Sequence, residues 1–552
     1  LSMETIDNRV RDILRVKFLT GLFDTPYQTD LALADKEVNS EAHQQVALQA
    51  SREGLVLLKN ANNLLPLDKS QIKRIAVCGP NADEASFALT HYGPVAVEVT
   101  TVLEGIKQQV KEGTKVTYTK GCDLVDANWP ESEIISYPLT AEEKTEIQKA
   151  VDNVKESDVA VVVLGGGIRT CGENKSRTSL DLPGHQQQLL EAIVATGKPV
   201  VLVLINGRPL SINWADKFVP AILEAWYPGS QGGTAIAEAL FGDYNPGGKL
   251  TVTFPKTVGQ IPFNFPAKPA SQVDGGQTPG VKGNQSRING PLYPFGYGLS
   301  YTTFEYSNLQ LSSPVITDKE PVTVTCKIKN TGTRSGDEVV QLYTRDVVSS
   351  VTTYEKNLRG FERVHLEPGE TKEISFQLLP RDFQLLNKDN HWVVEPGMFQ
   401  IMIGASSEDI RLKKGLEIRA YGQASANEII ESDPRDFISA SKNKSHILHV
   451  VDGDYSTTWK GEKGEYISFE LAENAKVDRI NVAWKNAETG THYEIQISSG
   501  GGQFLPVQRG EVTPNQEETI RFNKTGGSDL RILITNGSAE IAEIKLPELR
   551  KE

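Results

Sequence analysis

Short apolar runs that alternate with helical patterns between residues 40 and 260 constrain the fold of this chain most. The runs are KRIAVCG (73–79), DVAVVVLGGG (158–167), KPVVLVLING (198–207) and VPAILEAWY (219–227). Segments such as AEEKTEIQKAVDNVKES (141–157) and QGGTAIAEALFG (231–242) lie between or after them, with apolar residues at helical spacing. Strands with nearly continuous apolar residues are typical of a mostly parallel sheet that helices cover on both faces. The sequence therefore predicts an α/β sandwich in this part.

The apolar period changes to two after about residue 303. VTVTCKIKNTG (322–332) and DEVVQLYTRD (337–346) alternate as half-buried strands do, which predicts an immunoglobulin-like β-sandwich. A second β-rich unit follows a polar hinge, with strands such as EYISFEL (465–471) and HYEIQIS (492–498). We therefore predict a multidomain chain of α/β and all-β parts: an opening helix and linker (1–35), an α/β domain (36–302) and two sandwiches (303–421 and 422–552).

Composition excludes several classes of function. The 552 residues carry 58 Lys and Arg against 71 Asp and Glu, a formal net charge of −13, and no dense basic block, so nucleic acid is not an expected partner. No apolar run approaches the ~20 residues of a membrane span, and the first 30 residues lack the layout of a signal peptide. The four cysteines show no CxxC spacing, so neither a zinc site nor a disulfide framework is predicted.

The stretch RTCGENKSRTSLDLP (169–183) follows the apolar run DVAVVVLGGG and places Glu173 among Arg169, Lys175 and Arg177. In sheets of this kind, ligands gather beyond the carboxyl ends of the strands. From the residues alone, the favoured interpretation is a surface salt bridge from Glu173 to Arg177 or Arg169, with a catalytic acid as the alternative.

Long stretches of the chain resemble glycoside hydrolase family 3, in particular its β-glucosidases and β-xylosidases. The stretches include ASREGLVLLKNANNLLPL (50–67), GENKSRTSLDLPGHQQQLL (172–190), AWYPGSQGGTAIAEALFGDYNPGGKLTVTFP (225–255), PLYPFGYGLSYTTFEY (291–306) and NTGTRSGDEVVQLYTRD (330–346). The resemblance covers residues 1 to about 420, implies a fibronectin type III-like fold for the first sandwich, and makes Glu173 the general acid/base. Further candidates for contacts with the substrate are Arg169, Arg177, His91 and Tyr92.

The resemblance also implies a retaining mechanism whose second carboxylate, an aspartate nucleophile, belongs to an N-terminal (β/α)₈ barrel. No such segment precedes Leu1, and in the family the opening helix (SMETIDNRVRDILRVKFLTGLFD, 2–24) closes that barrel. We therefore expect a chain that is at most weakly active alone, whose barrel is either truncated away or supplied as a separate chain. No cofactor is required by this mechanism.

The expected reaction is the release of terminal β-D-glucosyl residues from β-linked oligosaccharides or polysaccharides, with xylose as the alternative sugar. A rival hypothesis of another class is a non-catalytic carbohydrate-binding or scaffolding protein. The family resemblance implies a periplasmic or secreted location, although this chain carries no export signal.

The terminal unit contains HVVDGDYSTTWKGEKGEYISFEL (449–471), which is similar to the signature of discoidin, or factor 5/8 type C, domains. Such jelly rolls often bind carbohydrate and often hold a structural calcium ion, for which Asp452, Asp454, Thr457 and Glu543 are the candidate oxygen donors. A sandwich without a ligand is an equally weighted alternative.

Overall fold

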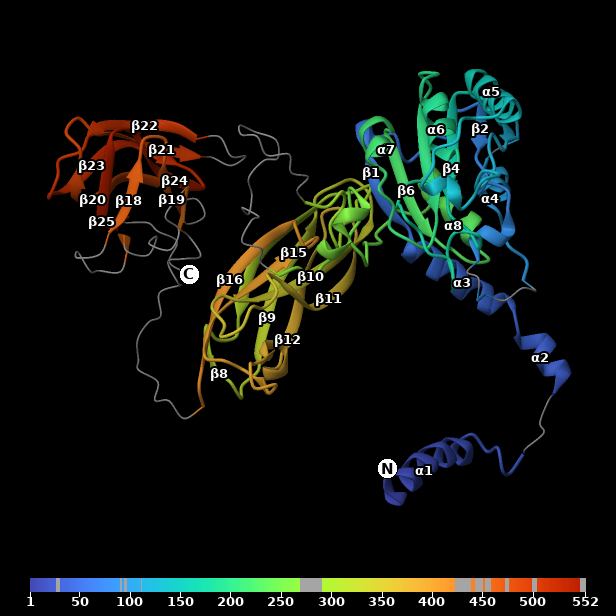
Figure 1. Cartoon of the computed structure of the whole chain (residues 1–552), viewed down its shortest axis with the longest axis horizontal. Coiled ribbons are helices and arrows are strands. Elements are labelled where there is room, and N and C mark those ends of the chain that lie inside the picture. Colours follow the sequence, from blue (N-terminus) through green and yellow to red (C-terminus); the bar gives the residue numbers. More distant parts are fainter. Residues whose placement is uncertain are drawn as a thin grey trace.

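The computed structural model describes residues 1–25, 30–89, 92–93, 97–110, 112–268, 290–421, 438–441, 450–451, 458–471, 476–498 and 504–546. Figure 1 shows a layered α/β unit, drawn in blue to green, which is followed along the chain by two all-β units in yellow to red. The predicted combination of an α/β sandwich with all-β units is therefore confirmed.

The α/β unit is built on a six-stranded sheet with the order β1-β6-β5-β4-β2-β3. Its strands are β1 (Val56–Asn60), β2 (Arg74–Cys78), β3 (Lys115–Thr119), β4 (Val159–Gly165), β5 (Val200–Ile205) and β6 (Ala221–Trp226). Neighbouring strands are parallel except β1 and β6, which are antiparallel. Every residue of β4 and β5 is buried, which explains their continuous apolar sequence.

Helices cover both faces of this sheet. They are α3 (Glu41–Gly54), α4 (Val102–Gln109), α5 (Ala141–Lys155), α6 (Gln186–Val194), α7 (Asn213–Phe218) and α8 (Gly232–Phe241). Ile147 of α5 and Leu189 of α6 share one core cluster with Val162 of β4. Ile106 of α4 shares the other cluster with Val161. Successive residues of β4 thus enter opposite cores, as the pleat of a strand requires.

Helices α4 and α8 approach each other through two glycines. A Cβ atom at Gly105 would lie 2.1 Å from the carbonyl oxygen of Gly233, and one at Gly233 would lie 2.0 Å from the carbonyl oxygen of Thr101. Thr101 also caps α4, because its hydroxyl accepts from the Glu104 amide at 3.2 Å while the Glu104 carboxylate accepts from the Thr101 amide at 2.8 Å. Thr101 therefore both caps the start of α4 and lies against the first turn of α8.

The first all-β unit is a sandwich of a five-stranded sheet (β11-β10-β15-β16-β8) and a three-stranded sheet (β12-β9-β7), with a small β13-β14 hairpin. Residues of β9 alternate between the buried core and the surface, as the period-two pattern predicts. The strands are β7 (Phe304–Leu311), β8 (Val315–Thr317), β9 (Val322–Asn330), β10 (Gly336–Asp346), β11 (Asn357–Leu366), β12 (Thr371–Leu378), β13 (Leu385–Leu386), β14 (Trp392–Val393), β15 (Gly397–Gly404) and β16 (Ile410–Arg419).

The second all-β unit has a five-stranded sheet (β17-β19-β24-β21-β22) and a four-stranded sheet (β18-β25-β20-β23) around the buried Trp459. Its strands are β17 (Ile438–Ala440), β18 (Trp459–Glu462), β19 (Tyr466–Glu470), β20 (Lys476–Ala487), β21 (His492–Ser498), β22 (Phe504–Glu511), β23 (Glu517–Gly526), β24 (Asp529–Asn536) and β25 (Ser538–Lys545). Short 3₁₀ turns elsewhere in the chain span Ala61–Asn63, Ala85–Ala88, Glu131–Glu133, Val258–Phe263 and Pro380–Phe383.

Arg363 of β11 joins the first sandwich to the α/β unit. Its guanidinium donates to Asp337 of the neighbouring strand at 2.8 Å and to the Tyr244 hydroxyl after α8 at 2.8 Å. It also pairs with Glu53 of α3 at 3.1 Å. The side chain is 24% exposed, so this junction is partly shielded from solvent.

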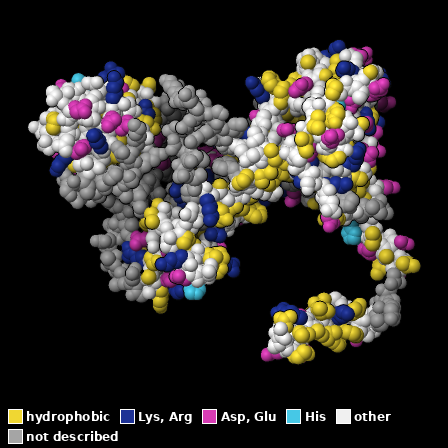
Figure 2. All heavy atoms as spheres, viewed as in Figure 1, with side chains coloured by type: hydrophobic (Ala, Val, Ile, Leu, Met, Phe, Trp, Pro, Cys, Tyr) yellow, Lys and Arg dark blue, Asp and Glu magenta, His cyan; other side chains and the backbone are white. Residues whose placement is uncertain are grey.

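Two helices precede α3 along the chain, α1 (Met3–Leu19) and α2 (Leu31–Glu37). The predicted amphipathic opening helix is present, but none of its residues is buried, and Figure 2 shows apolar side chains along it. Val10 is 49% exposed, Ile13 61% and Phe18 65%. No helix among the described residues is long and apolar enough to cross a membrane.

Candidate active site on the loop after strand β4

The loop at 166–182 leaves the sheet at the carboxyl end of β4 and leads to α6. Five buried polar residues cluster at the carboxyl edge near its start: Asn81, Thr170, Gln186, Asn206 and Glu224, each 2% exposed or less. Asn81 follows β2, Asn206 follows β5 and Glu224 lies near the end of β6. The loop is therefore rooted at the edge of the sheet where ligand sites of this architecture form.

Side-chain amides fix the start of the loop. The Gln186 amide nitrogen donates to the carbonyl oxygens of Leu124 at 2.8 Å and Gly165 at 2.9 Å, and its oxygen accepts from the Gly165 amide at 2.8 Å. The Asn81 amide nitrogen donates to the carbonyl oxygen of Gly166 at 2.8 Å. Because these bonds are buried, the direction in which the chain leaves β4 is strongly determined.

Glu173 lies on an exposed β-turn within the loop. The Lys175 amide closes the turn by donating to the Gly172 carbonyl oxygen at 3.1 Å. Asn174 at its third position has φ of 61°, in the left-handed region that Asn tolerates. The Glu173 amide donates to the Tyr92 hydroxyl oxygen at 2.8 Å. The backbone of Glu173 is thus held, while its carboxylate has no ion pair with any residue that the structure describes.

The salt bridge from Glu173 to Arg177 or Arg169 that the spacing favours is not formed. Arg177 instead donates through Nε to Glu133, with both side chains 5% exposed. The other oxygen of Glu133 accepts from the Thr178 amide at 2.8 Å, so Glu133 binds two adjacent residues of the loop. Arg169 is exposed and forms no ion pair within the described part of the chain. Substrate contacts by Arg177 and Arg169 remain predictions.

The surroundings of Arg177 show how the loop packs. Its guanidinium carbon lies 5.1 Å from the centre of the Trp129 ring, and one nitrogen donates to the Asp181 carbonyl oxygen at 3.0 Å. Burial and, secondarily, the charge of Arg208 lower the pKa of Arg177 to about 10. The cationic side chains of Arg177, in the loop, and Arg208, after β5, therefore lie near each other.

Arg208 and the residues behind it were not predicted from the sequence. Arg208 Nη2 donates to the carbonyl oxygen of Lys175, and its backbone amide donates to Asn206 Oδ1 at 3.2 Å. The Asn206 amide nitrogen lies 3.2 and 3.1 Å from the two oxygens of Glu224. Burial, which outweighs hydrogen bonds from Trp226 and Asn206, raises the pKa of Glu224 to about 8. A lone acid in the apolar run AILEAWY (221–227) was the available sequence signal.

The remaining predicted residues have different outcomes. Tyr92 is 68% exposed and contacts the backbone of Glu173, whereas His91 lies outside the described residues.

The predicted calcium donors Asp452, Asp454 and Thr457 also lie outside the described residues, while Glu543 of β25 is 7% exposed. Among the residues that are described, no three His, Cys, Asp or Glu side chains are grouped to hold a metal ion. Calcium binding remains a prediction.

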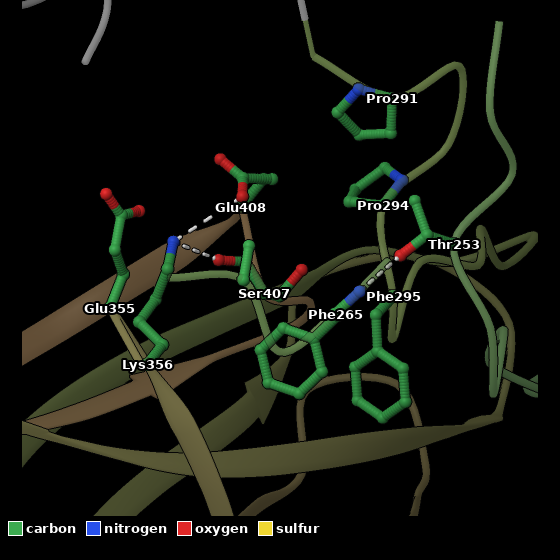
Figure 3. A pocket seen from close by; sticks show the side chains of 10 residues that line it. Thr253, Phe265, Pro291, Pro294, Phe295, Glu355, Lys356, Ser407 and Glu408 are labelled. Carbon is green, nitrogen blue, oxygen red and sulfur yellow. Dashed lines mark hydrogen bonds and ion pairs between the residues drawn. The ribbon is translucent and has the colours of Figure 1, made fainter. Parts of the chain in front are cut away.

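Figure 3 shows a cavity at the junction of the α/β unit and the first sandwich, away from the loop of Glu173 in the sequence. Its volume of about 50 Å³ accommodates a few water molecules. Phe265 and Phe295 stack at 4.4 Å on one side, and Lys356 donates to the Ser407 carbonyl oxygen at 2.6 Å on the other. The cavity is therefore too small for a sugar and is not the candidate active site.

The fold and the loop define a multidomain protein in which an α/β sheet carries Glu173 on a loop at its carboxyl edge and two β-sandwiches follow along the chain. Residues 55–301 match the glycosyl hydrolase family 3 C-terminal domain, and this part of the chain belongs to that family. Residues 338–407 match the fibronectin type III-like domain, and residues 434–545 match the F5/8 type C domain. The resemblances inferred from the sequence are thus confirmed for all three units.

Curated relatives match about three quarters of this chain. A β-xylosidase of Formosa agariphila is 43% identical over 420 residues, which are 74% of this chain and 55% of the relative. A periplasmic β-glucosidase of Salmonella typhimurium is 39% identical over 432 residues, covering 75% of this chain and 55% of the relative. The chain therefore spans about half the length of the curated relatives that it matches.

Solved structures of β-glucosidases also match about three quarters of this chain and about half of their own length. A β-glucosidase from Erythrobacter marinus matches with a TM-score of 0.66 and 39% identity, covering 74% of this chain and 54% of that one. A β-glucosidase from Listeria innocua, solved in complex with isofagomine, matches with a TM-score of 0.66 and 33% identity, covering 76% of this chain and 56% of that one.

Proposed function

We propose that Glu173 is the general acid/base of a retaining exo-β-glycosidase that hydrolyses terminal β-D-glucosyl residues of oligosaccharides. The observation that carries this proposal is an exposed carboxylate without an ionic partner among the described residues, on a turn whose backbone is fixed by Tyr92. A salt bridge would stabilise the ionised form of a carboxyl group and so disfavour proton donation to a substrate, and no such ion pair holds Glu173 among the described residues. The β-glucosidase and β-xylosidase relatives support the same chemistry.

In this mechanism Glu173 first donates a proton to the glycosidic oxygen while a nucleophilic aspartate forms a bond to the anomeric carbon. The bond between that carbon and the glycosidic oxygen breaks, and the protonated leaving group departs. The deprotonated Glu173 then removes a proton from water, whose oxygen attacks the anomeric carbon. The bond from this carbon to the aspartate breaks, which releases the sugar and restores both carboxyl groups. The two carboxyl groups of retaining enzymes stand about 5–5.5 Å apart. Their mutual repulsion helps to keep the acid protonated until it reacts.

The nucleophile would belong to a (β/α)₈ barrel, either in the same polypeptide or in a separate one. The apolar face of α1, with Ile13 61% and Phe18 65% exposed, is the surface that we assign to contact with this barrel. We therefore expect the 552-residue chain alone to have at most weak activity. Turnover of an aryl β-glucoside by this chain at the rate of an intact glycosidase would refute this part of the proposal.

The acid/base assignment is tested by Glu173→Gln in the protein that includes the barrel. We expect kcat/KM for phenyl β-glucoside to fall about 10²- to 10⁴-fold, because phenolate leaves slowly without a proton. The loss should be much smaller for 2,4-dinitrophenyl β-glucoside, whose leaving group needs no acid. Glu142→Gln, an exposed change on α5, is the matched control. Equal rates for the Glu173→Gln variant and the parent on phenyl β-glucoside would exclude the assignment.

A β-xylosidase is the second candidate, because the β-xylosidase of Formosa agariphila is 43% identical to this chain. Comparison of kcat/KM for 4-nitrophenyl β-D-glucoside and β-D-xyloside distinguishes the two. A protein that hydrolyses neither, but binds β-glucan or xylan, would support the non-catalytic alternative.

The F5/8 type C domain is proposed to hold the enzyme on polysaccharide, which would raise the local substrate concentration. Pull-down on insoluble β-glucan with and without residues 422–552 tests this role, and equal retention of both proteins would exclude it. A periplasmic or secreted location is a further proposal, supported by the periplasmic relative.

A further inference from the structure

The turn that presents Glu173 is held on both sides. On one side the Glu173 amide donates to the Tyr92 hydroxyl oxygen at 2.8 Å. On the other side the carbonyl oxygen of Lys175, the last residue of the turn, accepts from Arg208 Nη2. The turn is exposed to solvent. These two contacts restrict its orientation, together with the hydrogen bond that the Lys175 amide donates to the Gly172 carbonyl oxygen at 3.1 Å.

Arg208 is itself fixed to the buried end of the sheet. Its amide donates to Asn206 Oδ1 at 3.2 Å, and the Asn206 amide donates to the carbonyl oxygen of Trp226 at 3.0 Å. Asn206 also donates to Glu224, which accepts from the Trp226 amide at 2.8 Å. Asn206 is 2% exposed and Glu224 is fully buried. The backbone of Arg208 is thus hydrogen-bonded to a buried part of the domain.

Arg208 has no ion pair that would explain its presence. No carboxylate among the described residues pairs with it, and its Nε atom is buried without a hydrogen-bond partner in that part of the chain. The neighbouring charge is the cation Arg177 rather than an acid. The contact that remains for the guanidinium is therefore the carbonyl oxygen of Lys175.

We propose that Arg208 is a positioning residue that orients the turn bearing Glu173 toward the glycosidic oxygen, with Asn206 and Glu224 fixing Arg208 to the sheet. The proposal rests on the proposed acid/base role of Glu173. The planar guanidinium suits this task, because its donors are fixed in one plane, whereas the Lys ammonium is a flexible point charge.

The restraint that Arg208 places on the turn can be tested in the 552-residue chain without any activity, because amide hydrogen exchange reports local opening. We expect Arg208→Met to increase the rate of amide hydrogen exchange in the peptide covering 168–182 about 10-fold, while peptides from β4 and α6 exchange as in the parent. Arg381→Met, an exposed change in the first sandwich, should alter neither. An unchanged rate at 168–182 in Arg208→Met would overturn the proposal.

The kinetic test uses the protein that includes the barrel and two aryl β-glucosides. We expect Arg208→Met to lower kcat/KM for phenyl β-glucoside about 10- to 100-fold, the scale of a misplaced catalytic group. For 2,4-dinitrophenyl β-glucoside the loss should stay below about 3-fold, because that leaving group needs no proton. Arg208→Lys should fall between Arg208→Met and the parent. Equal losses on both substrates would indicate a merely structural role and overturn the proposal.

The two hypotheses fail differently. If Glu173→Gln shows no preference for the better leaving group, the acid/base role is wrong, whatever the exchange rates in Arg208→Met. If Glu173→Gln shows that preference while Arg208→Met does not, the acid/base role stands and the positioning role of Arg208 is wrong.

Discussion

Arg177 and Glu133 form an ion pair in which each side chain is only 5% exposed, although 44 residues separate them in the sequence. Glu133 ends a 3₁₀ turn, and the same carboxylate accepts from the Thr178 amide at 2.8 Å. The pair therefore attaches the loop of Glu173 to the domain at a second point. This point comes after the turn along the chain, whereas β4 anchors the loop before the turn.

Replacement of Glu133 by Ala should be strongly destabilising. It would leave the Arg177 guanidinium buried without its partner, a situation that typically costs about 3–5 kcal/mol. Urea denaturation of the 552-residue chain measures the change in the free energy of unfolding. The control is Glu142→Ala, which removes an exposed acid and should stay within about 0.5 kcal/mol of the parent. Similar values for the two variants would show that the buried pair is not an attachment.

Glu224 should make stability decrease as pH rises. In the folded chain burial raises the pKa of its carboxyl group to about 8, while in the unfolded chain the group ionises near its ordinary value of 4.5. The folded state therefore binds more protons between these values, and this residue contributes a loss of about 1.4 kcal/mol per pH unit in that window. Above pH 8 the contribution becomes constant.

The Glu224→Gln variant should lack this component, since an amide does not titrate. Its free energy of unfolding relative to the parent should increase steadily from pH 5 to pH 8 in urea titrations at fixed salt. A difference that is independent of pH would show that Glu224 is already ionised in the folded chain.

Arg363→Ala should loosen the junction between the first sandwich and the α/β unit. The change removes contacts with Asp337, Tyr244 and Glu53 at once. Because the side chain is 24% exposed, we expect a cost of about 1–3 kcal/mol rather than that of a fully buried charge. Calorimetry should show the unfolding of the two units separating, and Arg381→Ala should not. A single unchanged transition would contradict this expectation.

Polar substitutions on α1 should separate stability from activity. Ile13 and Phe18 are 61% and 65% exposed, so Ile13→Ser and Phe18→Ser should change the free energy of unfolding of the 552-residue chain by less than about 0.5 kcal/mol. If this face contacts the barrel, the same changes should lower activity or weaken association with the barrel measured by calorimetry. Full activity of the double variant would exclude that contact.

The fold could be predicted where the sequence has a long and regular pattern. The runs around Val162 and Val203 are buried throughout, so their apolar sequence identified β4 and β5. The strand β1 (Val56–Asn60) was not predicted, because it follows α3 after the single residue Leu55. The six-residue helix α7 was also missed, since it is too short to show a periodicity.

The site was only partly predictable for a different reason. Glu173 could be singled out by resemblance and by its position after an apolar strand. The nearest basic residues in the sequence suggested the wrong ionic partners, because Arg177 pairs across 44 residues with Glu133. Likewise, the contact of Arg208 with Lys175 joins two loops that only the sheet brings together. Such pairings depend on topology and are not encoded in local spacing.

The strand order has a consequence for biosynthesis. β1 ends at Asn60, yet its neighbour in the sheet, β6, begins only at Ala221. At typical translation rates this gap amounts to roughly ten to thirty seconds, during which the apolar residues Val56, Leu57 and Leu58 have no strand to pair with. The nascent chain therefore exposes an apolar strand that has no neighbouring strand until β6 has been synthesised. We expect ribosome-associated chaperones to bind the chain during this interval.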